Sequence, residues 1–340
     1  MDLILESSHI RKNMLTGEEV LVTPHRNKRP WQGKLETISA EKRLLLDPNC
    51  YLCPGNTRAN GEINPTYKNV YSFQNDFASL QENGVVLTLD DGLFQAHSEL
   101  GICKVICFSP DHSKSLADMS LREIESVVRL WKKEFLELSN KEFINYVQIF
   151  ENKGAIMGCS NPHPHGQIWS QSSIPNEITK KDTQQRQYFQ EHSTTLLTEY
   201  ITQELVKQER IIFENDTFVV LTPFWSLWPF EAMIVPKKAS KDISQLSIEE
   251  ESQFAEAISV LTKAYDKLFN CSFPYSSGIH QAPTNLSNND HWHWHMSFYP
   301  PLLRSATVKK FMVGYEMFAM PQRDITTECA AKMIQDVIKV

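Results

Sequence analysis

The segment Ser160–Trp169 constrains this 340-residue chain more than any other stretch. It reads Ser-Asn-Pro-His-Pro-His-Gly-Gln-Ile-Trp and follows an apolar, strand-like run at residues 146–150. In an extended strand, successive side chains point to opposite faces. We therefore predict that His163, His165 and Gln167 project from the same side of a strand.

This arrangement suits chemistry at phosphorus. Pro164 stiffens the backbone between the two imidazoles, and Gly166 allows another backbone or a ligand to approach closely. A rigidly held imidazole can attack phosphorus while an amide two residues further on holds the phosphoryl oxygens. The plain alternative is a turn that contains two histidines. That alternative suits a bare His-x-His better than this longer, ordered segment.

Composition argues against several classes of protein. The net charge is −7, whereas a nucleic-acid-binding surface needs clustered basic residues. No apolar run approaches the ~20 residues of a membrane span, and the opening residues 1–6 carry an early acid that a signal peptide would lack. The seven cysteines follow no disulfide-scaffold pattern. We expect a cytoplasmic protein with no membrane and no nucleic acid among its partners.

The chain repeats a pattern of strand, capped helix and histidine-rich strand. In the first half, a strand-like run at residues 105–110 precedes a capping box that begins at Ser120. In the second half, a run at residues 232–236 precedes a capping box at Ser247. Strands in helix-separated groups, with short turns within each group, predict an α+β fold with a largely antiparallel sheet and flanking helices.

Helices are also expected between the halves and at the end of the chain. Residues 170–181 are polar and suit a loop, after which a connecting helix is expected over about residues 182–208. A last helix is expected from about Thr326, because apolar residues recur there at helical spacing.

The run at residues 163–167, His-Pro-His-Gly-Gln, resembles the signature of the galactose-1-phosphate uridylyltransferase branch of the histidine-triad superfamily. Further blocks match this family in its order: Pro24–Gly33, Cys50–Asn56, Phe73–Phe77, Val105–His112, Phe298–Val308 and Lys310–Glu316. The resemblance covers nearly the whole chain. It implies one continuous sheet built from two histidine-triad-like halves, residues 1–178 with the zinc site and the nucleophile, and residues 179–340.

Cys50 and Cys53 have the spacing of a zinc knuckle. A redox pair has the same spacing, although we see no thioredoxin-like βαβ context here. Tetrahedral zinc needs two more ligands. The resemblance supplies them as His112 and His163, which would close a Cys2His2 site and fix the strand two residues before His165.

The family's second metal site is doubtful in this chain. His280 and His295 match two of its ligand positions, but Ser297 and Lys181 occupy the other two. A protonated amine cannot bind a metal, and a serine hydroxyl is a poor neutral ligand. Further histidines within residues 291–293 leave a rearranged site open. Hydrogen-bonded histidines on a strand are the better interpretation.

By this resemblance, the substrates are a UDP-hexose and a hexose 1-phosphate. His165 would attack the uridine-bearing phosphorus of UDP-glucose, release glucose 1-phosphate and leave a uridylyl-histidine, which galactose 1-phosphate would convert to UDP-galactose. The carbonyl of His163 would orient the ring. Gln167 stands where hydrolytic relatives carry a third histidine. An amide can donate a hydrogen bond but cannot relay a proton, which favours transfer over hydrolysis.

Matching family positions also imply contacts with the substrates. These residues are Arg26, Arg29, Ala59, Asn75, Asp76, Asn152, Ser160, Lys310, Phe311, Tyr315, Glu316 and Gln322. Asn75 and Asp76 would hold the nucleoside, and the two arginines would neutralise phosphate charge. In the family the arginine segment reaches across a dimer interface, so we expect a homodimer.

Two other functions stay open at this point. One is a related nucleotidyl phosphorylase or transferase that acts on ADP-sugars or dinucleoside polyphosphates. The other is a zinc-organised binding module without catalysis. The binding module would explain the four metal ligands but leave residues 165–167 unexplained.

Overall fold

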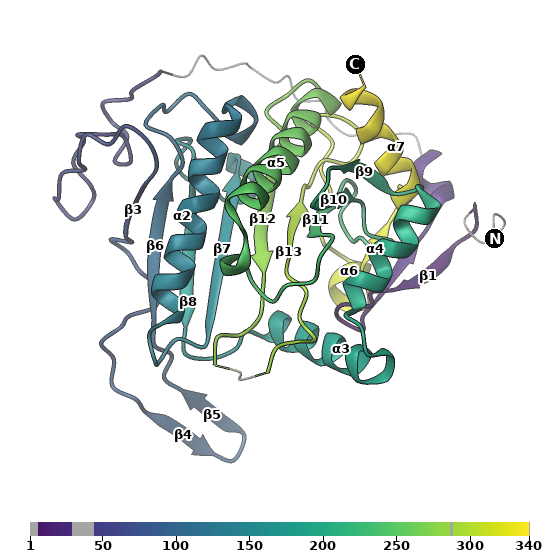
Figure 1. Cartoon of the computed structure of the whole chain (residues 1–340), viewed down its shortest axis with the longest axis horizontal. Coiled ribbons are helices and arrows are strands. Elements are labelled where there is room, and N and C mark those ends of the chain that lie inside the picture. Colours follow the sequence, from purple (N-terminus) through teal and green to yellow (C-terminus); the bar gives the residue numbers. More distant parts are fainter. Residues whose placement is uncertain (1–5, 29–43, 286–287, 340) are drawn as a thin grey trace.

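The computed structural model describes residues 6–28, 44–285 and 288–339, so Arg29 lies outside the described residues. A nine-stranded sheet runs through the molecule, and all its neighbouring strands pair antiparallel (Figure 1). In spatial order the strands are β3 (Tyr71–Gln74), β6 (Gly101–Cys107), β8 (His165–Gln171), β7 (Tyr146–Lys153), β12 (Tyr275–His280), β13 (His295–Tyr299), β11 (Ala232–Pro236), β10 (Phe218–Leu221) and β9 (Ile211–Glu214). The two halves of the chain join where β7 pairs with β12. The predicted α+β fold with a continuous, largely antiparallel sheet is confirmed.

Smaller elements surround this sheet. A three-stranded sheet contains β1 (His9–Lys12), β2 (Glu19–Val22) and β14 (Gln322–Arg323), and a hairpin contains β4 (Thr88–Asp91) and β5 (Phe94–His97). The helices are α2 (Leu121–Ser139), α3 (Asn176–His192), α4 (Leu196–Lys207), α5 (Ile248–Leu268), α6 (Tyr315–Phe318) and α7 (Thr327–Ile338). In the described parts of the chain, no helix is both long and apolar enough to cross a membrane.

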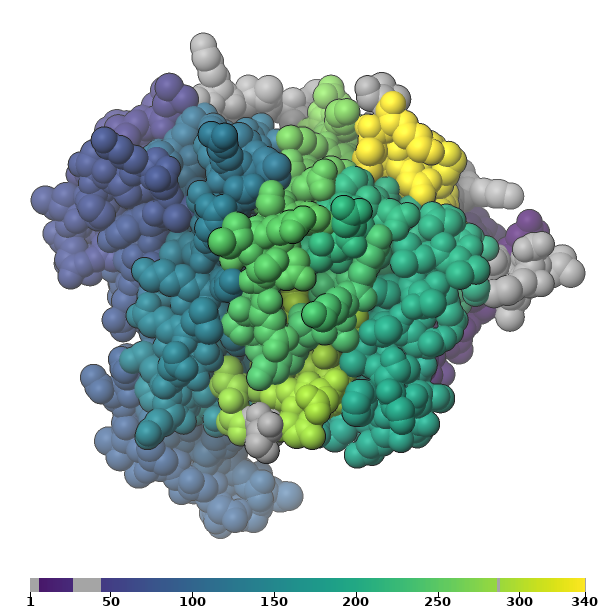
Figure 2. Space-filling view, in the orientation of Figure 1, coloured from purple at the N-terminus to yellow at the C-terminus, as the bar shows by residue number. Residues whose placement is uncertain are grey.

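The long helices α2 and α5 lie side by side over one face of the sheet (Figure 1). Figure 2 shows this face covered by the side chains of the helices. Both predicted capping boxes form. The hydroxyls of Ser120 and Ser247 each accept the backbone N–H of the Glu three residues on, and the carboxylate of that Glu accepts the backbone N–H of the serine. The apolar stripes of both helices pack on the sheet in the main core, with Trp131 of α2 fully buried.

The alternation of β8 fixes which residues face these helices. Ile168 is buried in the core shared with α2 and α5. Burial alternates along the strand, so that Gly166, Ile168 and Ser170 are buried and His165 and Gln167 are only partly covered. His165 and Gln167 therefore lie on the face of the sheet away from the core of α2, as the sequence predicts.

The connecting helix differs from its prediction. A helix already begins at Asn176 and ends at His192, and its C-cap Ser193 adopts a left-handed conformation with φ 58°. A second helix then begins after Thr195, whose hydroxyl accepts the N–H of Thr198. The cap at Thr195 competes with a continuous helix, which explains the break. The last helix is confirmed, with Thr326 as its N-cap.

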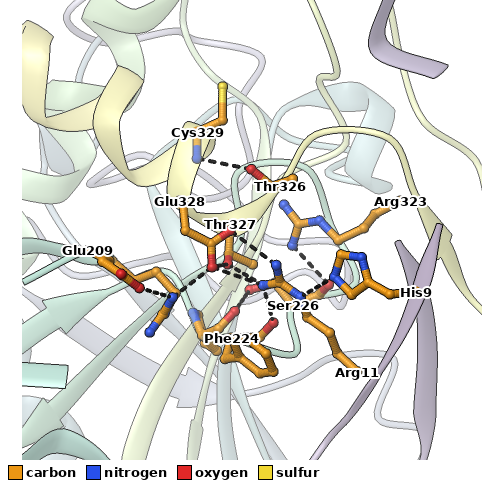
Figure 3. A network of polar contacts seen from close by, with 12 residues as sticks. His9, Arg11, Glu209, Phe224, Ser226, Arg323, Thr326, Thr327, Glu328 and Cys329 are labelled. Atoms are coloured by element: carbon orange, nitrogen blue, oxygen red, sulfur yellow. Dashed lines mark hydrogen bonds and ion pairs between the residues drawn. The ribbon is translucent and has the colours of Figure 1, made fainter. Parts of the chain in front are cut away.

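A buried network ties the N-terminal strand to the last helix (Figure 3). Both nitrogens at the end of the Arg11 guanidinium donate to the carboxylate of Glu328, at 3.1 and 3.2 Å, and Arg210 Nη1 donates to the same carboxylate at 2.7 Å. The Arg11 guanidinium also lies 4.1 Å from the ring centre of Phe224. Burial opposes ionisation of Glu328, but the hydrogen bonds and charge of the arginines outweigh it and lower the pKa of this carboxyl to about 2.

We predict that Glu328→Gln lowers the free energy of unfolding at pH 7 by ~3–5 kcal/mol, because it leaves the buried guanidinium of Arg11 without its carboxylate, whereas Arg210 keeps its pair with Glu204. A lowered pKa contributes stability above the ordinary pKa of Glu and loses it as pH falls toward the folded-state value. The gap between wild type and variant should therefore be constant from pH 7 to about 5 and shrink toward pH 2. Urea unfolding at a series of pH values measures it.

Lys332→Gln provides the matched control. It breaks the exposed pair between Lys332 and Asp336 on the same helix and should cost less than ~0.5 kcal/mol. Equal effects of the two substitutions would show that the buried network does not fasten β1 to α7.

Candidate active site

His165 begins β8 and pairs in register with Cys107 of β6. Its Nδ1 lies 2.8 Å from the carbonyl oxygen of His163. A carbonyl only accepts hydrogen bonds, so Nδ1 carries the proton and donates it to this oxygen, and Nε2 keeps its lone pair. Burial lowers the pKa of His165 below its usual value, against the opposing effect of this hydrogen bond, and favours the neutral ring.

Gln167 lies on the same face two residues later. Its Oε1 accepts the indole N–H of Trp169 at 3.0 Å. On the opposite face, a Cβ at Gly166 would lie 2.8 Å from the backbone oxygen of Phe150 and 2.8 Å from the ring of Phe108. The close approach expected at this glycine is therefore to the protein's own backbone and core.

Three cavities meet at His165. Their volumes are about 530, 300 and 40 Å³, and both His165 and Ser160 line all of them. Ala59, Asn75 and Asp76 line the 300 Å³ cavity together with Gln167. The three cavities bring together seven of the residues that the sequence assigns to catalysis or substrate binding. Six of them line the 300 Å³ cavity, and the seventh, Asn152, lines the other two cavities.

The polar groups of these cavities are held by neighbours. The carboxylate of Asp76 pairs with Arg58 Nη1 at 3.3 Å, and the buried guanidinium of Arg58 lies 4.3 Å from the ring centre of Phe73. Asn152 Oδ1 accepts the hydroxyl of Ser276 at 2.6 Å. Because each side chain is restrained, the cavity walls are largely preformed.

The remaining predicted contacts form a second cluster. Lys310 Nζ donates to Glu316 Oε1 at 2.6 Å, and the backbone N–H of Gln322 donates to the same oxygen at 2.9 Å. The amide of Gln322 and Nε of Arg26 both donate to Asp324 Oδ1, at 2.6 and 3.1 Å. None of these residues lines the three cavities around His165 within the described residues. Phe311 and Tyr315, next to this cluster in sequence, are 59% and 54% exposed.

Cys50, Cys53, His112 and His163 come together as a buried group whose ligand atoms all lie within 4.8 Å of one another. Cys53 Sγ lies 3.6 Å from Nδ1 of both histidines. Tetrahedral zinc with ordinary Zn–S and Zn–N bonds requires a sulfur–nitrogen separation of ~3.6 Å. Burial is the main cause that raises the pKa of the Cys53 thiol to about 11, so a thiolate here needs a bound cation. The residues fit a tetrahedral metal ion.

Neighbours that the sequence did not reveal orient this group. The Tyr67 hydroxyl donates to the carbonyl of Leu52 at 2.7 Å, so its oxygen accepts the Nε2–H of His163 at 3.0 Å. That contact leaves the Nδ1 lone pair of His163 facing Cys53. The amide of Asn161 donates to Cys50 Sγ at 3.4 Å and accepts the backbone N–H of His163 at 2.9 Å.

The doubtful second metal site does not fit a metal. Lys181 Nζ lies 2.9 Å from Nε2 of His295, so the amine occupies the nitrogen that would bind the ion. The rings of His280 and His295 stack at 5.0 Å. The nearby His291 and His293 face other partners, Asp182 Oδ1 and the carbonyl of Pro236, each at 2.7 Å. The rings of His291, His293 and His295 are thus committed to contacts within the protein.

Known protein families and relatives match this chain along nearly its whole length. The models of the galactose-1-phosphate uridyl transferase N-terminal and C-terminal domains match residues 1–175 and 180–340. The chain belongs to this family. The galactose-1-phosphate uridylyltransferase of Haemophilus influenzae is 49% identical over 98% of this chain and 96% of its own length. That of Saccharomyces cerevisiae is 43% identical over 97% and 94%.

Solved structures share the fold of this family. One uridylyltransferase superposes with a TM-score of 0.78 at 24% identity, covering 97% of this chain and 98% of its own. An ADP-glucose phosphorylase from Arabidopsis thaliana superposes with a TM-score of 0.76 at 23% identity, covering 97% and 99%. At this identity, the likeness bears on the fold and not on the substrate.

We predict about one tightly held zinc per purified chain and no second stoichiometric metal. Cys53→Ser should lower metal content and thermal stability together, because metal binding contributes to the free energy of folding. Metal analysis by mass spectrometry and thermal unfolding measure both.

Cys103→Ser is the control, since Cys103 is equally buried and lies outside the metal cluster. It should lower stability through lost packing and leave the metal content unchanged. A fully active wild-type protein without metal would contradict the assigned site. Two metals per chain would contradict the reading of Lys181.

Proposed function

We propose that this protein transfers a uridylyl group between UDP-glucose and galactose 1-phosphate through a covalent intermediate on His165. The main support is the 2.8 Å hydrogen bond from Nδ1 of His165 to the carbonyl oxygen of His163. The ring of His165 also lines all three cavities. The hydrogen bond commits one nitrogen to the backbone and leaves the other as a nucleophile.

The reaction balances without an external proton donor. The Nε2 lone pair forms a bond to the uridine-bearing phosphorus, and the bond from that phosphorus to the bridging oxygen breaks, so the electron pair leaves with glucose 1-phosphate. The ring becomes an imidazolium. Its Nδ1–H remains hydrogen-bonded to the carbonyl oxygen of His163, and this bond stabilises the new positive charge. A phosphate oxygen of galactose 1-phosphate then attacks the same phosphorus and returns the electron pair to Nε2.

Each cavity takes a part of the substrates. The nucleoside occupies the 300 Å³ cavity beside Ala59, Asn75 and Asp76, and the hexose phosphate extends into the 530 Å³ cavity. Asn152 and Ser160 donate to phosphoryl oxygens where the cavities meet. In this arrangement Gln167 is the third hydrogen-bond donor to the reacting phosphoryl group.

Zinc is the proposed metal, held by Cys50, Cys53, His112 and His163. When bound, it acts as a structural ion that fixes His163 and takes no part in the transfer. We place the boundary between the two halves at residue 178, so that residues 1–178 carry the zinc ligands and nucleophile and residues 179–340 carry Lys310, Glu316 and Gln322 of the second cluster. No disulfide joins the described cysteines, which supports a cytoplasmic location.

Uridylyl transfer is favoured over ADP-sugar chemistry by relatives at 43–49% identity along nearly the full chain. A mixing assay separates the two. UDP-glucose with galactose 1-phosphate should yield UDP-galactose, whereas ADP-glucose with phosphate should yield no product. The reverse outcome would support the phosphorylase, and no product from either pair would favour the binding module.

His165→Asn should abolish labelling of the protein by UDP-glucose alone, because asparagine lacks a nucleophilic ring nitrogen. The wild-type label should be labile to acid and stable to base, as a phosphoramidate is. His192→Asn, at an exposed histidine on α3, is the control and should label fully. Labelling that persists in the His165 variant would place the nucleophile elsewhere.

Gln167→His should shift the intermediate toward hydrolysis. An imidazole there can take a proton from water, a role worth ~10²–10⁴-fold where general acid–base catalysis operates. Release of UMP from UDP-glucose without acceptor, corrected for the amount of uridylylated protein, measures the effect. An unchanged rate would mean that exclusion of water, rather than Gln167, protects the intermediate.

We also propose a homodimer in which each copy completes the other's site. Within the described part of the chain, none of Lys310, Glu316 and Gln322 lines a cavity around His165. The adjoining segment exposes five large apolar side chains: Phe311, Val313, Tyr315, Met317 and Phe318 are 54–90% exposed. An exposed apolar segment beside a polar cluster is typical of an interface.

Complementation tests this sharing. His165→Asn and Lys310→Met should each be inactive alone. In a mixed dimer, one site carries both substitutions and the other carries neither, so co-expressed variants should recover about a quarter of wild-type activity by random pairing. Recovery of no activity would show that His165 and Lys310 of the same chain act together.

A further inference from the structure

Trp169 holds one end of the Gln167 side chain. Its indole N–H donates to Gln167 Oε1 at 3.0 Å, from the same face of the same strand. An indole N–H only donates, so the atom it meets is the amide oxygen. The oxygen and nitrogen of an amide diverge from one carbon. Fixing Oε1 on Trp169 therefore turns Nε2 away from it.

The tryptophan is itself restrained. Its ring packs edge-on against Phe150 of β7, with centroids 5.9 Å apart and planes at 77°. Phe150 belongs to the wall of the 40 Å³ cavity, with Gln167 and His165. Trp169 lines none of the three cavities around His165 within the described residues. It thus contacts the amide without reaching the substrate space.

The orientation of this amide matters for transfer. The last torsion of a glutamine side chain is broad and roughly two-fold, so an unrestrained amide takes both orientations. One orientation presents N–H groups to the phosphoryl oxygens, and the other presents an oxygen, which repels them. Only the first stabilises the charge that develops as His165 attacks.

We propose that Trp169 is a positioning residue that locks Gln167 in its donor orientation and acts on the reaction only through that amide. The inference rests on the proposed function, since it gives Gln167 the role of a phosphoryl donor. The competing interpretation is that Trp169 only packs against Phe150. The two interpretations differ in whether the effect of Trp169 requires the amide.

A double-mutant cycle separates them. Trp169→Phe removes the N–H donor and keeps an aromatic ring against Phe150, and Gln167→Met removes the amide and keeps the side-chain length. The measurement is the single-turnover release of glucose 1-phosphate from UDP-glucose by the full-length protein. Trp169→Phe should slow it about threefold to tenfold, the value of one modest hydrogen bond, and leave the KM for UDP-glucose within about twofold.

In the Gln167→Met background, Trp169→Phe should have no further effect, within about twofold. An equal slowing in both backgrounds, or no slowing in either, would overturn the inference. If Trp169→Phe misfolds, as shown by lost zinc or a lowered melting temperature, benzothienylalanine at position 169 replaces it. This residue keeps the indole shape and puts sulfur in place of the N–H.

Failure of the proposed function gives a different result. Wild-type protein would then release no glucose 1-phosphate and take up no uridylyl label, which overturns the inference as well. A wild type that reacts normally, with variants that fail the cycle, overturns the role of Trp169 alone.

Discussion

The chemistry of this protein depends on one hydrogen bond, from Nδ1 of His165 to the carbonyl of His163. A carbonyl can orient a ring only if it is itself held. Three contacts hold His163: its N–H donates to Asn161, its Nδ1 faces Cys53 and its Nε2 donates to Tyr67. The four candidate metal ligands and the nucleophile therefore form one connected unit, in which a metal bound to His163 would fix the carbonyl that orients His165.

The opposite face of the same strand explains why this unit is rigid. Gly166 lets the backbone of β8 lie against the backbone of β7 and the ring of Phe108, where any side chain would collide. Ile168 then anchors the strand in the core under α2. Because one face of β8 is fixed by packing, and side chains alternate along a β-strand, His165 and Gln167 lie on the other face.

Local patterns made much of this predictable. Strand alternation placed His165 and Gln167 on one face, and capping boxes placed α2 and α5, because both signals lie within a few residues. Tyr67 and Asn161 were missed, since their contacts with the metal cluster arise only when distant segments pack together. The sequence marks Trp169 only as part of the motif, because its contact with Gln167 depends on side-chain geometry.

Other predictions depended on facts that a sequence does not carry. The break between α3 and α4 is accompanied by a left-handed conformation at Ser193, a residue type that gives no strong stop signal. The family resemblance put Lys310 and His165 in one site, whereas within the described chain they lie in separate clusters. In the proposed homodimer the two clusters come from different copies of the chain, and a sequence does not state which copy supplies each residue.

The most direct test of the central claim is to locate the bond formed on His165. Protein with isotope-labelled histidine is reacted with UDP-glucose alone and studied by phosphorus–nitrogen NMR after digestion at alkaline pH. We expect phosphorus on Nε2 of His165, with the proton remaining on Nδ1. Phosphorus on Nδ1, or on any other residue, would contradict it, because the His163 carbonyl would then not be what selects the nucleophile.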